Sequence, residues 1–269
     1  MIPFTKAHAC GNDFLIVSED AAADYDRANL TRRLCDRHTG IGADGIEFFS
    51  WTGKSSGRIR LHNADGSIAE ISGNGTRCVA AWMAEALGSK PGDVLEIATD
   101  AGMRFCRLES PHGQHVEVTS GMGIPTIEPK TLTVLDSLDL QGMVVSTGNP
   151  HFVILVKDTK FNLGHWQWNS VAVEVCTHED FPNQTNVEFV HVAGPHEIEI
   201  RIWERGVGPT LSSGTGSSAA AAAAIAFRGC RSPLVVVAPG GAQTVTWDSP
   251  GSELFLTGPA TLIATGEAF

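Results

Sequence analysis

The sequence predicts a mixed α/β (α+β) protein built from two copies of one structural unit. Short runs of β-forming residues recur along the 269-residue chain, with only a few helical stretches between them. Residues 62–88 and 203–229 repeat one layout of strand end, glycine-rich turn and helix. The second helical stretch is nearly all Ala and Ser and lacks the polar stripe of a surface helix. We therefore expect a strand-rich fold in which this helix is buried.

The β-type runs predict strands joined by turns, because the loops between them are rich in Gly, Pro, Asp and Asn. These runs are residues 14–16, 58–62, 94–98, 115–119, 143–146, 152–156, 187–191, 197–203, 234–238, 243–247 and 254–256.

The two repeated segments match in detail. Each begins with a polar residue at the end of a β-type run, Asn63 in the first and Glu204 in the second. Nine residues later a serine precedes Gly-x-Gly, as Ser72-Gly-Asn-Gly and Ser213-Gly-Thr-Gly. A helical stretch follows, and it ends at a glycine sixteen residues after the serine, where a helix C-cap belongs. The repeat predicts one half over residues 1–120 plus 259–269 and the other over residues 121–258.

The charge and the distribution of apolar residues exclude several classes of function. The formal net charge is −11, and no run of basic residues is longer than Arg32-Arg33, which argues against nucleic acid or anionic membrane as a partner. The N-terminal residues show no signal-peptide pattern, and the longest apolar run, residues 219–227, is too short to span a membrane. We expect a cytoplasmic protein whose six scattered cysteines are free thiols.

The paired Gly-x-Gly turns predict an anion site at each helix N-terminus, because glycines there let successive backbone N–H groups point at one ligand. Two such turns suit chemistry at the α-carbon of an amino acid. Removing the α-proton builds negative charge on the carboxylate, which preorganised N–H donors stabilise. Inversion then needs a proton acceptor on one face and a donor on the other, so we expect the residues before the two helices to face a shared cleft.

The sequence does not support a nucleotide-binding, metal-binding or serine-hydrolase motif. Residues 40–45 match G-x-G-x-x-G literally, but a helix end rather than a strand precedes them and Asp44 lies inside the turn. The chain has no P-loop, no H-E-x-x-H and no paired C-x-x-C, and neither Ser72 nor Ser213 lies in G-x-S-x-G. We expect no metal and no bound cofactor.

Six motifs, spread over most of the chain, resemble the diaminopimelate epimerase family in order and approximate spacing. The resemblance implies two pseudo-symmetric domains, each a β-barrel-like mixed sheet around a central helix, with the active site in the cleft between them. It also implies cofactor-independent interconversion of LL- and meso-diaminopimelate in lysine and cell-wall synthesis. The motifs are HACGNDFLIV (8–17), RHTGIGADGI (37–46), NADGSIAEISGNGTRC (63–78), GNPHFV (148–153), TNVEFV (185–190) and ERGVGPTLSSGTG (204–216).

The resemblance assigns roles to particular residues. The reacting carboxylate is expected on the backbone amides of Gly73-Asn74 and Gly214-Thr215, and His151 matches a histidine near the cleft. A distal amino-acid end needs a guanidinium for its carboxylate and oxygen acceptors for its ammonium. The matching positions for that end are Asn12, Asn63, Asn149, Asn186, Glu204 and Arg205.

Two departures fall at decisive positions. The family has a cysteine before each Gly-x-Gly, where this chain has Ser72 and Ser213, and it commonly has Glu where this chain has Pro209. A thiol has a pKa near ~8.5 and an unactivated hydroxyl one near that of water, ~15.7. That gap corresponds to about 9–10 kcal/mol of lost basicity. We therefore expect Ser72 and Ser213 to occupy the catalytic positions of a chain that binds substrate without epimerising it.

Two explanations of the serines stay open at this point. One is deliberate replacement of both cysteines by their near-isostere. The other is a natural homologue that binds an amino acid without epimerising it, or an isomerase acting on a different amino acid. The expected partner is a small molecule, diaminopimelate, and the sequence leaves a homodimer open.

Overall fold

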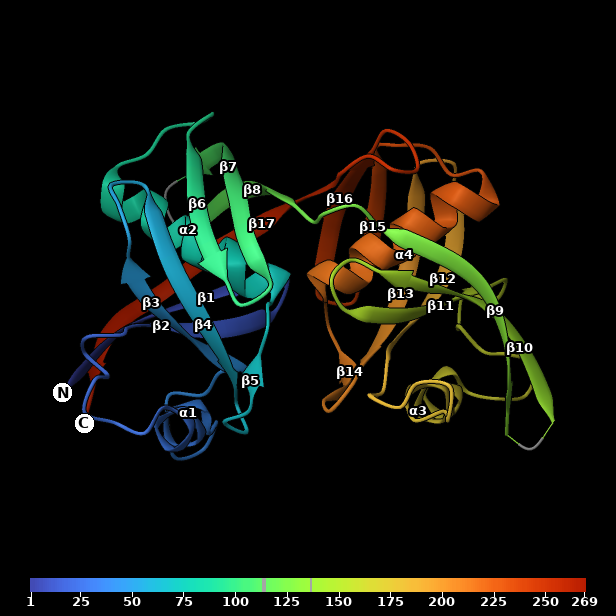
Figure 1. Ribbon diagram of the computed structural model, residues 1–269, viewed down its shortest axis with the longest axis horizontal. Coiled ribbons are helices and arrows are strands. Elements are labelled where there is room, and N and C mark those ends of the chain that lie inside the picture. The colour runs from blue at the N-terminus through green and yellow to red at the C-terminus, as the bar shows by residue number, and fades with distance from the viewer. Residues whose placement is uncertain (113–114, 136) are drawn as a thin grey trace. The chain divides into compact units, whose positions relative to one another are not determined.

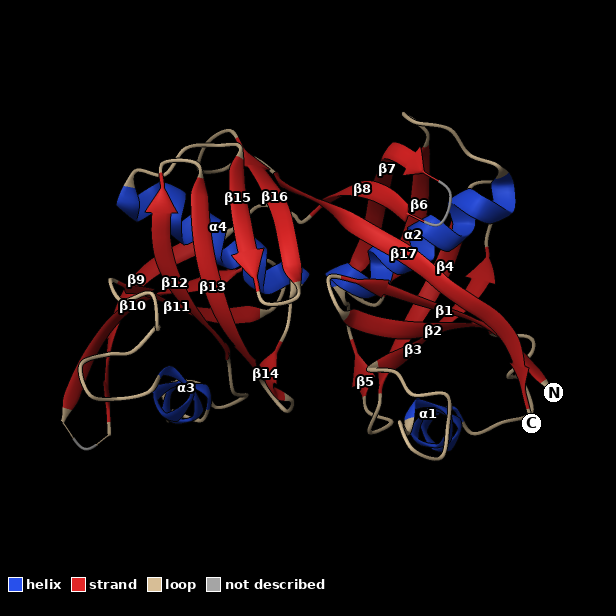
Figure 2. Ribbon diagram, turned by 180° about the vertical axis from the view of Figure 1, so that it is seen from behind, coloured by secondary structure: helices blue, strands red, loops and turns tan. Residues whose placement is uncertain are grey.

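The computed structural model describes residues 1–112, 115–135 and 137–269 and has the expected mixed α/β class (Figure 1). The chain divides into two compact units. Unit 1 comprises Met1–Gly121 and Thr257–Phe269, and unit 2 comprises Met122–Leu256. Each unit has one helix surrounded by its strands and one further helix against the sheet (Figure 2).

Unit 1 is a closed barrel. Within the described residues, eight strands pair in the order β1–β2–β3–β4–β6–β7–β8–β17, and β17 returns to β1; the short β5 pairs with β4. The pairs β2–β3 and β4–β6 are parallel, and the other pairs with a printed register are antiparallel. The strands are β1 (Ile2–Ala9), β2 (Asn12–Ser18), β3 (Gly45–Trp51), β4 (Ser56–Asn63), β5 (Ile68–Ala69), β6 (Val94–Thr99), β7 (Gly102–His112), β8 (His115–Gly121) and β17 (Leu254–Ala268).

Helix α2 (Gly73–Leu87) lies inside this barrel, where it contacts β1, β2, β6, β7 and β8. Apolar side chains of α2 and the strands form one continuous core, in which Val79, Met83 and Ile97 have no exposed surface. Helix α1 (Arg27–Cys35) packs against β3 and β4 and covers a second apolar cluster that includes Ile46 and Phe48. Strand β3 therefore has one face toward each helix, since its side chains alternate.

Unit 2 repeats this arrangement. Its strands pair in the order β9–β10–β11–β12–β13–β15–β16, with parallel pairs at β11–β12 and β13–β15 and the short β14 on β13. Helix α4 contacts β10, β11, β12, β13, β15 and β16. The elements are β9 (Thr126–Val134), β10 (Leu138–Ser146), β11 (Pro150–Val156), α3 (Trp168–Cys176), β12 (Asn186–Gly194), β13 (Glu197–Glu204), β14 (Gly208–Thr210), α4 (Gly214–Arg228), β15 (Leu234–Ala238) and β16 (Gly241–Trp247).

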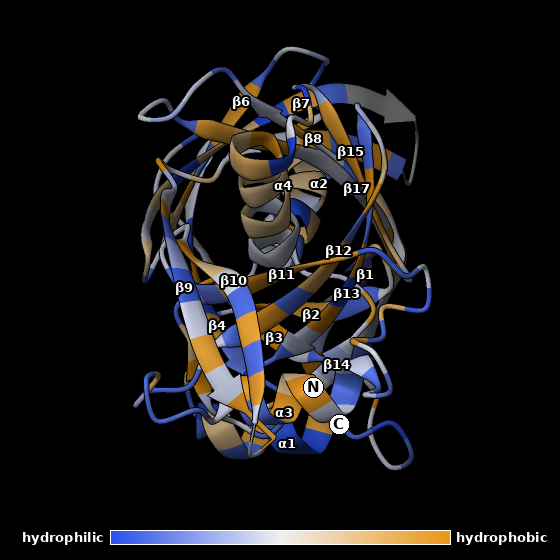
Figure 3. Cartoon of the chain, turned by 90° about the vertical axis from the view of Figure 1, so that its right-hand side faces the viewer, coloured by the Kyte–Doolittle hydropathy of each residue, from blue (hydrophilic) through white to orange (hydrophobic). Residues whose placement is uncertain are grey.

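Helix α4 is buried over most of its length, which confirms the expectation from its composition. Residues 214–224 are all buried, and six consecutive alanines have no exposed surface. Figure 3 colours much of this helix on the hydrophobic side of the scale. Small side chains let the surrounding strands approach the helix axis closely, because a larger residue would need space that a packed interior does not have.

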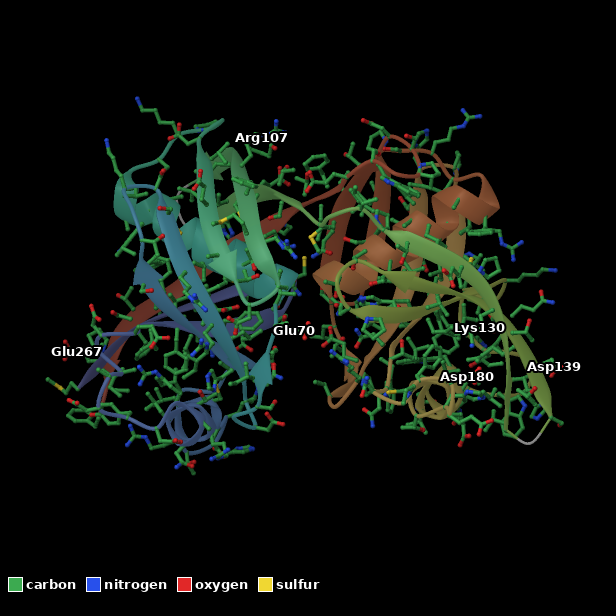
Figure 4. All side chains as sticks on the ribbon, viewed as in Figure 1. Glu70, Arg107, Lys130, Asp139, Asp180 and Glu267 are labelled. Carbon is green, nitrogen blue, oxygen red and sulfur yellow. The ribbon has the colours of Figure 1, made fainter. Side chains whose placement is uncertain are left out.

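Helix α3 closes the other face of the unit 2 sheet. It contacts β9, β12 and β13, and its buried side chains join a core cluster with Phe152 and Phe189. After the end of α3, Asp180 Oδ2 forms an ion pair with Lys130 Nζ of β9 at 3.0 Å. Both side chains are labelled in Figure 4. In the described part of the chain no helix is long and apolar enough to cross a membrane, and all six cysteines are buried free thiols.

Candidate functional site

Each predicted catalytic serine is the N-cap of a central helix. Ser72 precedes α2 with extended backbone angles, and its Oγ accepts a hydrogen bond from Gly75 N at 3.0 Å. Ser213 precedes α4 in the same way, and its Oγ accepts from Gly216 N at 3.3 Å. Both helices end at a left-handed C-cap glycine, as the sequence spacing predicts. The two predicted strand–turn–helix repeats are therefore confirmed as local structures.

In unit 1 a chain of hydrogen bonds runs from the first turns of α2 through the start of β2 to Asp44, which precedes β3. We call Ser72, Asn12, Asp44, Asn74 and Arg77 the Ser72 cluster. Arg77 Nη2 donates to Asn74 Oδ1 at 2.5 Å, and Asn74 Nδ2 donates to Asn12 Oδ1 at 3.2 Å. Asn12 Nδ2 then donates to the carboxylate of Asp44 at 2.6 Å. Because each amide has its oxygen and nitrogen assigned by a neighbour, the orientation of both amides is fixed.

An ionic network holds the outer end of this cluster. Arg37 Nη2 lies 2.7 Å from the carboxylate oxygens of both Asp44 and Asp13, and Lys6 Nζ lies 3.1 Å from Asp13. Burial acts to raise the pKa of Asp13, but hydrogen bonds from Arg37 and Lys6 outweigh it, and the pKa is lowered. Asp13 is therefore ionised at neutral pH. Asn63 lies at the end of β4, where its Nδ2 donates to Ser67 Oγ at 3.1 Å.

Unit 2 carries a second chain, formed by Ser213, Thr215, Asn149, His151 and Glu188, which we call the Ser213 cluster. Glu188 Oε1 lies 2.7 Å from His151 Nδ1, and neither side chain is exposed. His151 Nε2 contacts Asn149 Oδ1 at 3.0 Å, and Asn149 Nδ2 donates to Thr215 Oγ1 at 3.3 Å. Thr215 Oγ1 in turn lies 3.4 Å from Ser213 Oγ. The chain thus joins a buried carboxyl to the predicted catalytic position.

The orientation of Asn149 decides where the protons of this cluster are. Its Nδ2 faces Thr215, so its Oδ1 faces His151 Nε2, which must carry a hydrogen and donate it. His151 Nδ1 lies on the opposite side of the ring and faces Glu188 Oε1, so the imidazole connects the buried carboxyl to the amide of Asn149.

The remaining predicted binding residues of unit 2 lie at the ends of neighbouring strands. Asn186 begins β12, and its Oδ1 accepts from Arg205 N at 3.0 Å. Arg205 follows β13 directly, and its guanidinium donates to Asn183 O at 3.4 Å. Glu204, the last residue of β13, pairs across the sheet with Gly208 beside Pro209 of β14. Within the described residues no group of side chains is arranged to bind a metal ion.

The structure adds two carboxyls for which no role was predicted from the sequence. Glu47 of β3 and Glu188 of β12 occupy matching positions, each two residues after the first residue of its strand that pairs with the neighbouring parallel strand. Neither side chain is exposed. A Cβ built on Gly75 would lie 2.0 Å from Glu47 Oε1, and one on Gly216 would lie 2.7 Å from Glu188 Oε1. The second glycine of each Gly-x-Gly therefore lets a carboxyl lie against the first turn of the helix.

Comparison with known proteins identifies the family. The family model described as diaminopimelate epimerase matches residues 4–127 and 143–263. The chain belongs to the diaminopimelate epimerase family. It is 36% identical to the diaminopimelate epimerase of Thermosynechococcus vestitus over 98% of each chain. It is also 36% identical to that of Halothermothrix orenii over 99% of this chain and 97% of the relative. By family, the chain is an amino-acid epimerase.

Solved structures share the fold at low sequence identity. A predicted epimerase from Pseudomonas aeruginosa matches with a TM-score of 0.76 at 14% identity, over 100% of this chain and 99% of its own. A hydroxyproline epimerase from Agrobacterium vitis, with bound trans-4-OH-L-proline, matches with a TM-score of 0.69 at 15% identity, over 98% and 90%. These matches show that the chain shares its fold with both proteins.

Proposed function

We propose that this chain binds diaminopimelate and that the Ser72 and Ser213 clusters belong to a machinery for two-base epimerisation of LL- to meso-diaminopimelate. The observation that carries the proposal is the repeated cluster itself. Each unit presents a serine N-cap on a buried helix, with amide side chains at the first turn. Inverting an α-carbon requires one proton acceptor and one proton donor on opposite faces. Two related clusters supply one group each.

The proposed binding mode follows from the charges of the substrate. The positive end of each helix suits the reacting carboxylate, which we place on the backbone amides of Gly73-Asn74 and Gly214-Thr215. The distal end carries a second carboxylate and an ammonium. Arg205 suits the carboxylate, because a guanidinium binds it through two parallel hydrogen bonds. The oxygens of Glu204 and of Asn12, Asn63, Asn149 and Asn186 suit the ammonium and the remaining polar atoms.

The serines limit what the clusters do on their own. A hydroxyl with no stronger base behind it is a far weaker proton acceptor than a thiolate, by the ~7 pH units that separate the two ordinary pKa values. We propose that the chain binds diaminopimelate and inverts it negligibly. The paired serines also favour a second candidate, a homologue whose function is to bind an amino acid without converting it. A racemase of a smaller amino acid is the third.

Calorimetry separates these candidates. LL- and meso-diaminopimelate are titrated into the chain beside histidine, proline and glutamate. We expect both diaminopimelate isomers to bind and the smaller amino acids to bind much more weakly, because these lack the distal zwitterion. Arg205→Met should weaken diaminopimelate binding at least about tenfold, since a hydrogen bond to a charged group contributes ~1.5–3 kcal/mol.

Arg231→Met is the matched control, because Arg231 is exposed and its backbone N–H donates to Pro195 O. Its diaminopimelate affinity should equal that of the parent. Binding of proline alone, or of no amino acid in the panel, contradicts the proposed substrate.

A further inference from the structure

The described part of unit 1 contains a buried carboxyl without a hydrogen-bond partner. Neither oxygen of Glu47 has a donor or acceptor among the described residues, and the side chain is fully buried. A carboxyl in such a place costs folding free energy, because it must lose its hydration without a compensating hydrogen bond. An apolar side chain of similar size would fill the same space without this cost. Buried titratable groups of this kind occur mainly where a protein uses them.

Glu47 lies beside the predicted catalytic serine. A methyl group on Gly75 would lie 2.0 Å from Glu47 Oε1 and 3.3 Å from Ser72 Cβ, so both groups border the same point at the start of α2. The Ser72 hydroxyl oxygen accepts a hydrogen bond from Gly75 N. A hydroxyl can donate its own hydrogen and accept another at the same oxygen.

The matching position in unit 2 differs in one respect. Glu188 Oε1 is bound by His151 of β11, whereas the residue of β2 in the equivalent register position is Phe14. Glu188 is therefore engaged by an imidazole that faces Asn149. At the equivalent position beside Glu47, the phenyl ring of Phe14 offers no basic group.

We propose that Glu47 is the proton-holding residue of unit 1 and that it accepts the α-proton of the substrate through the Ser72 hydroxyl. The Cα–H bond breaks and an O–H bond forms at Ser72 Oγ. The original O–H bond of Ser72 breaks, and its proton goes to the Glu47 carboxylate, which becomes a carboxylic acid. The electron pair stays on the α-carbon and is delocalised into the substrate carboxylate. Glu47 acts through Ser72, so it is a positioning residue rather than one that touches substrate.

The acidity of Glu47 fits this role. Burial raises its pKa from 4.5 to about 8, close to the ~8.5 of the thiol that the family has at position 72. The group that ends up with the proton is then a carboxyl instead of an alkoxide, which removes most of the basicity gap of a serine. Two titratable groups of α2 lie near Glu47. Cys78 interacts electrostatically with Glu47, and Arg77 interacts electrostatically with Cys78. The sheet partners of Glu47, Ile16 and Leu61, are apolar.

This inference rests on the proposed function only for the identity of the substrate. It predicts that the chain exchanges the α-proton of bound diaminopimelate with solvent on one face, without inverting it. The rate of α-proton exchange should rise about tenfold per pH unit below pH ~8 and level off above it, because the Glu47 carboxylate is the form that accepts a proton.

The test combines exchange, binding and direct titration. Deuterium incorporation into LL- and meso-diaminopimelate is followed in D₂O between about pH 6 and pH 9 for the parent and for Glu47→Gln. Glu47→Gln should lose the exchange at least about a hundredfold, the size of a typical general-base contribution, while binding diaminopimelate with the affinity of the parent. Glu96→Gln, at an exposed glutamate of β6, should keep both the rate and the pH profile.

A carboxyl titration of the unsubstituted chain removes dependence on the variant folding. Infrared difference spectra of the parent should show a protonated carboxyl that titrates near pH 8, absent from Glu47→Gln. A parent that binds diaminopimelate but exchanges no faster than Glu47→Gln overturns the role of Glu47 and leaves the substrate proposal standing. A carboxyl that is already ionised at pH 6 overturns it as well (about two units below its expected midpoint). A parent that binds no diaminopimelate overturns the substrate proposal, and the carboxyl titration then decides on Glu47 alone.

Discussion

Replacing Gly75 with alanine should destabilise unit 1, although helix propensity alone predicts the opposite. Gly75 is the third residue of α2, and alanine in a helix is favoured over glycine by about 0.8–1 kcal/mol. The new Cβ would lie 2.0 Å from Glu47 Oε1, whereas an ordinary contact is 3.4–4 Å. The carboxyl must therefore move by more than an ångström.

The cost of that movement sets the magnitude. Glu47 Oε1 is the end of a side chain, but the side chain is fully buried, so its neighbours must move with it. Forcing extra atoms into a packed core costs about 1–3 kcal/mol. Subtracting the propensity gain leaves a net loss of about 1 kcal/mol. In the double variant Gly75→Ala with Glu47→Ala the contact is gone, so the gain in helix propensity should be recovered. The free energies of unfolding of the two positions should therefore be coupled by about 1–3 kcal/mol.

Urea unfolding of the parent, the two single variants and the double variant measures these quantities. Gly194→Ala is the control, because Gly194 has open space around its Cα and its change should stay within about 0.5 kcal/mol. A Gly75→Ala variant that is about 1 kcal/mol more stable than the parent contradicts the tight contact between Glu47 and the start of α2. It would mean that Glu47 is free to leave the start of α2.

Two further predictions concern buried positions. Because the pKa of Glu47 is raised from 4.5 to about 8 in the folded state, that state binds more protons than the unfolded chain between these values, and stability must fall as pH rises through this window. The free energy of unfolding, measured from pH 5 to 8, should fall by up to about 4 kcal/mol at ~1.36 kcal/mol per pH unit, and Glu47→Gln should lack this fall; parallel curves for the two proteins contradict this. In α4, Ala222→Leu should cost about 1–3 kcal/mol because Ala222 has no exposed surface, whereas Ala226→Leu at an exposed site should stay within about 0.5 kcal/mol. Equal thermal shifts for both would contradict the burial of α4.

The sequence predicted the elements that carry a local signal. All the predicted β-type runs lie within strands, and both helices that follow a Ser-Gly-x-Gly turn begin and end within a residue or two of the places indicated by their serine and glycine. Capping is a local interaction between residues close in sequence, so a single chain shows it. The lack of a polar stripe likewise identified α4 as buried, because an exposed helix needs polar side chains on one face.

The sequence did not predict β3, because it reads as a continuous apolar run with one charge in the middle. Residues 45–51 follow a glycine-rich turn and do not alternate, since β3 packs against helices on both faces. The burial of Glu47 therefore had no local sign. Its meaning depends on the closeness of Gly75, 28 positions along the chain, which only the folded barrel brings about. The same holds for Glu188, which lies in a recognised motif but gains a partner only through the pairing of β11 with β12.

If positions 72 and 213 are the sites of proton transfer, restoring the two thiols should restore inversion. LL-to-meso conversion of diaminopimelate is measured for the parent, Ser72→Cys, Ser213→Cys and the double variant under identical conditions. We expect negligible inversion by the parent and by Ser72→Cys, slow inversion by Ser213→Cys because Ser72 with Glu47 still serves one face, and conversion faster by many orders of magnitude for the double variant. The effects of the two substitutions are non-additive, because a proton acceptor on one face is useful only with a proton donor on the other. Rapid inversion by the parent, or none by the double variant, would contradict the assignment of positions 72 and 213 as the sites of proton transfer.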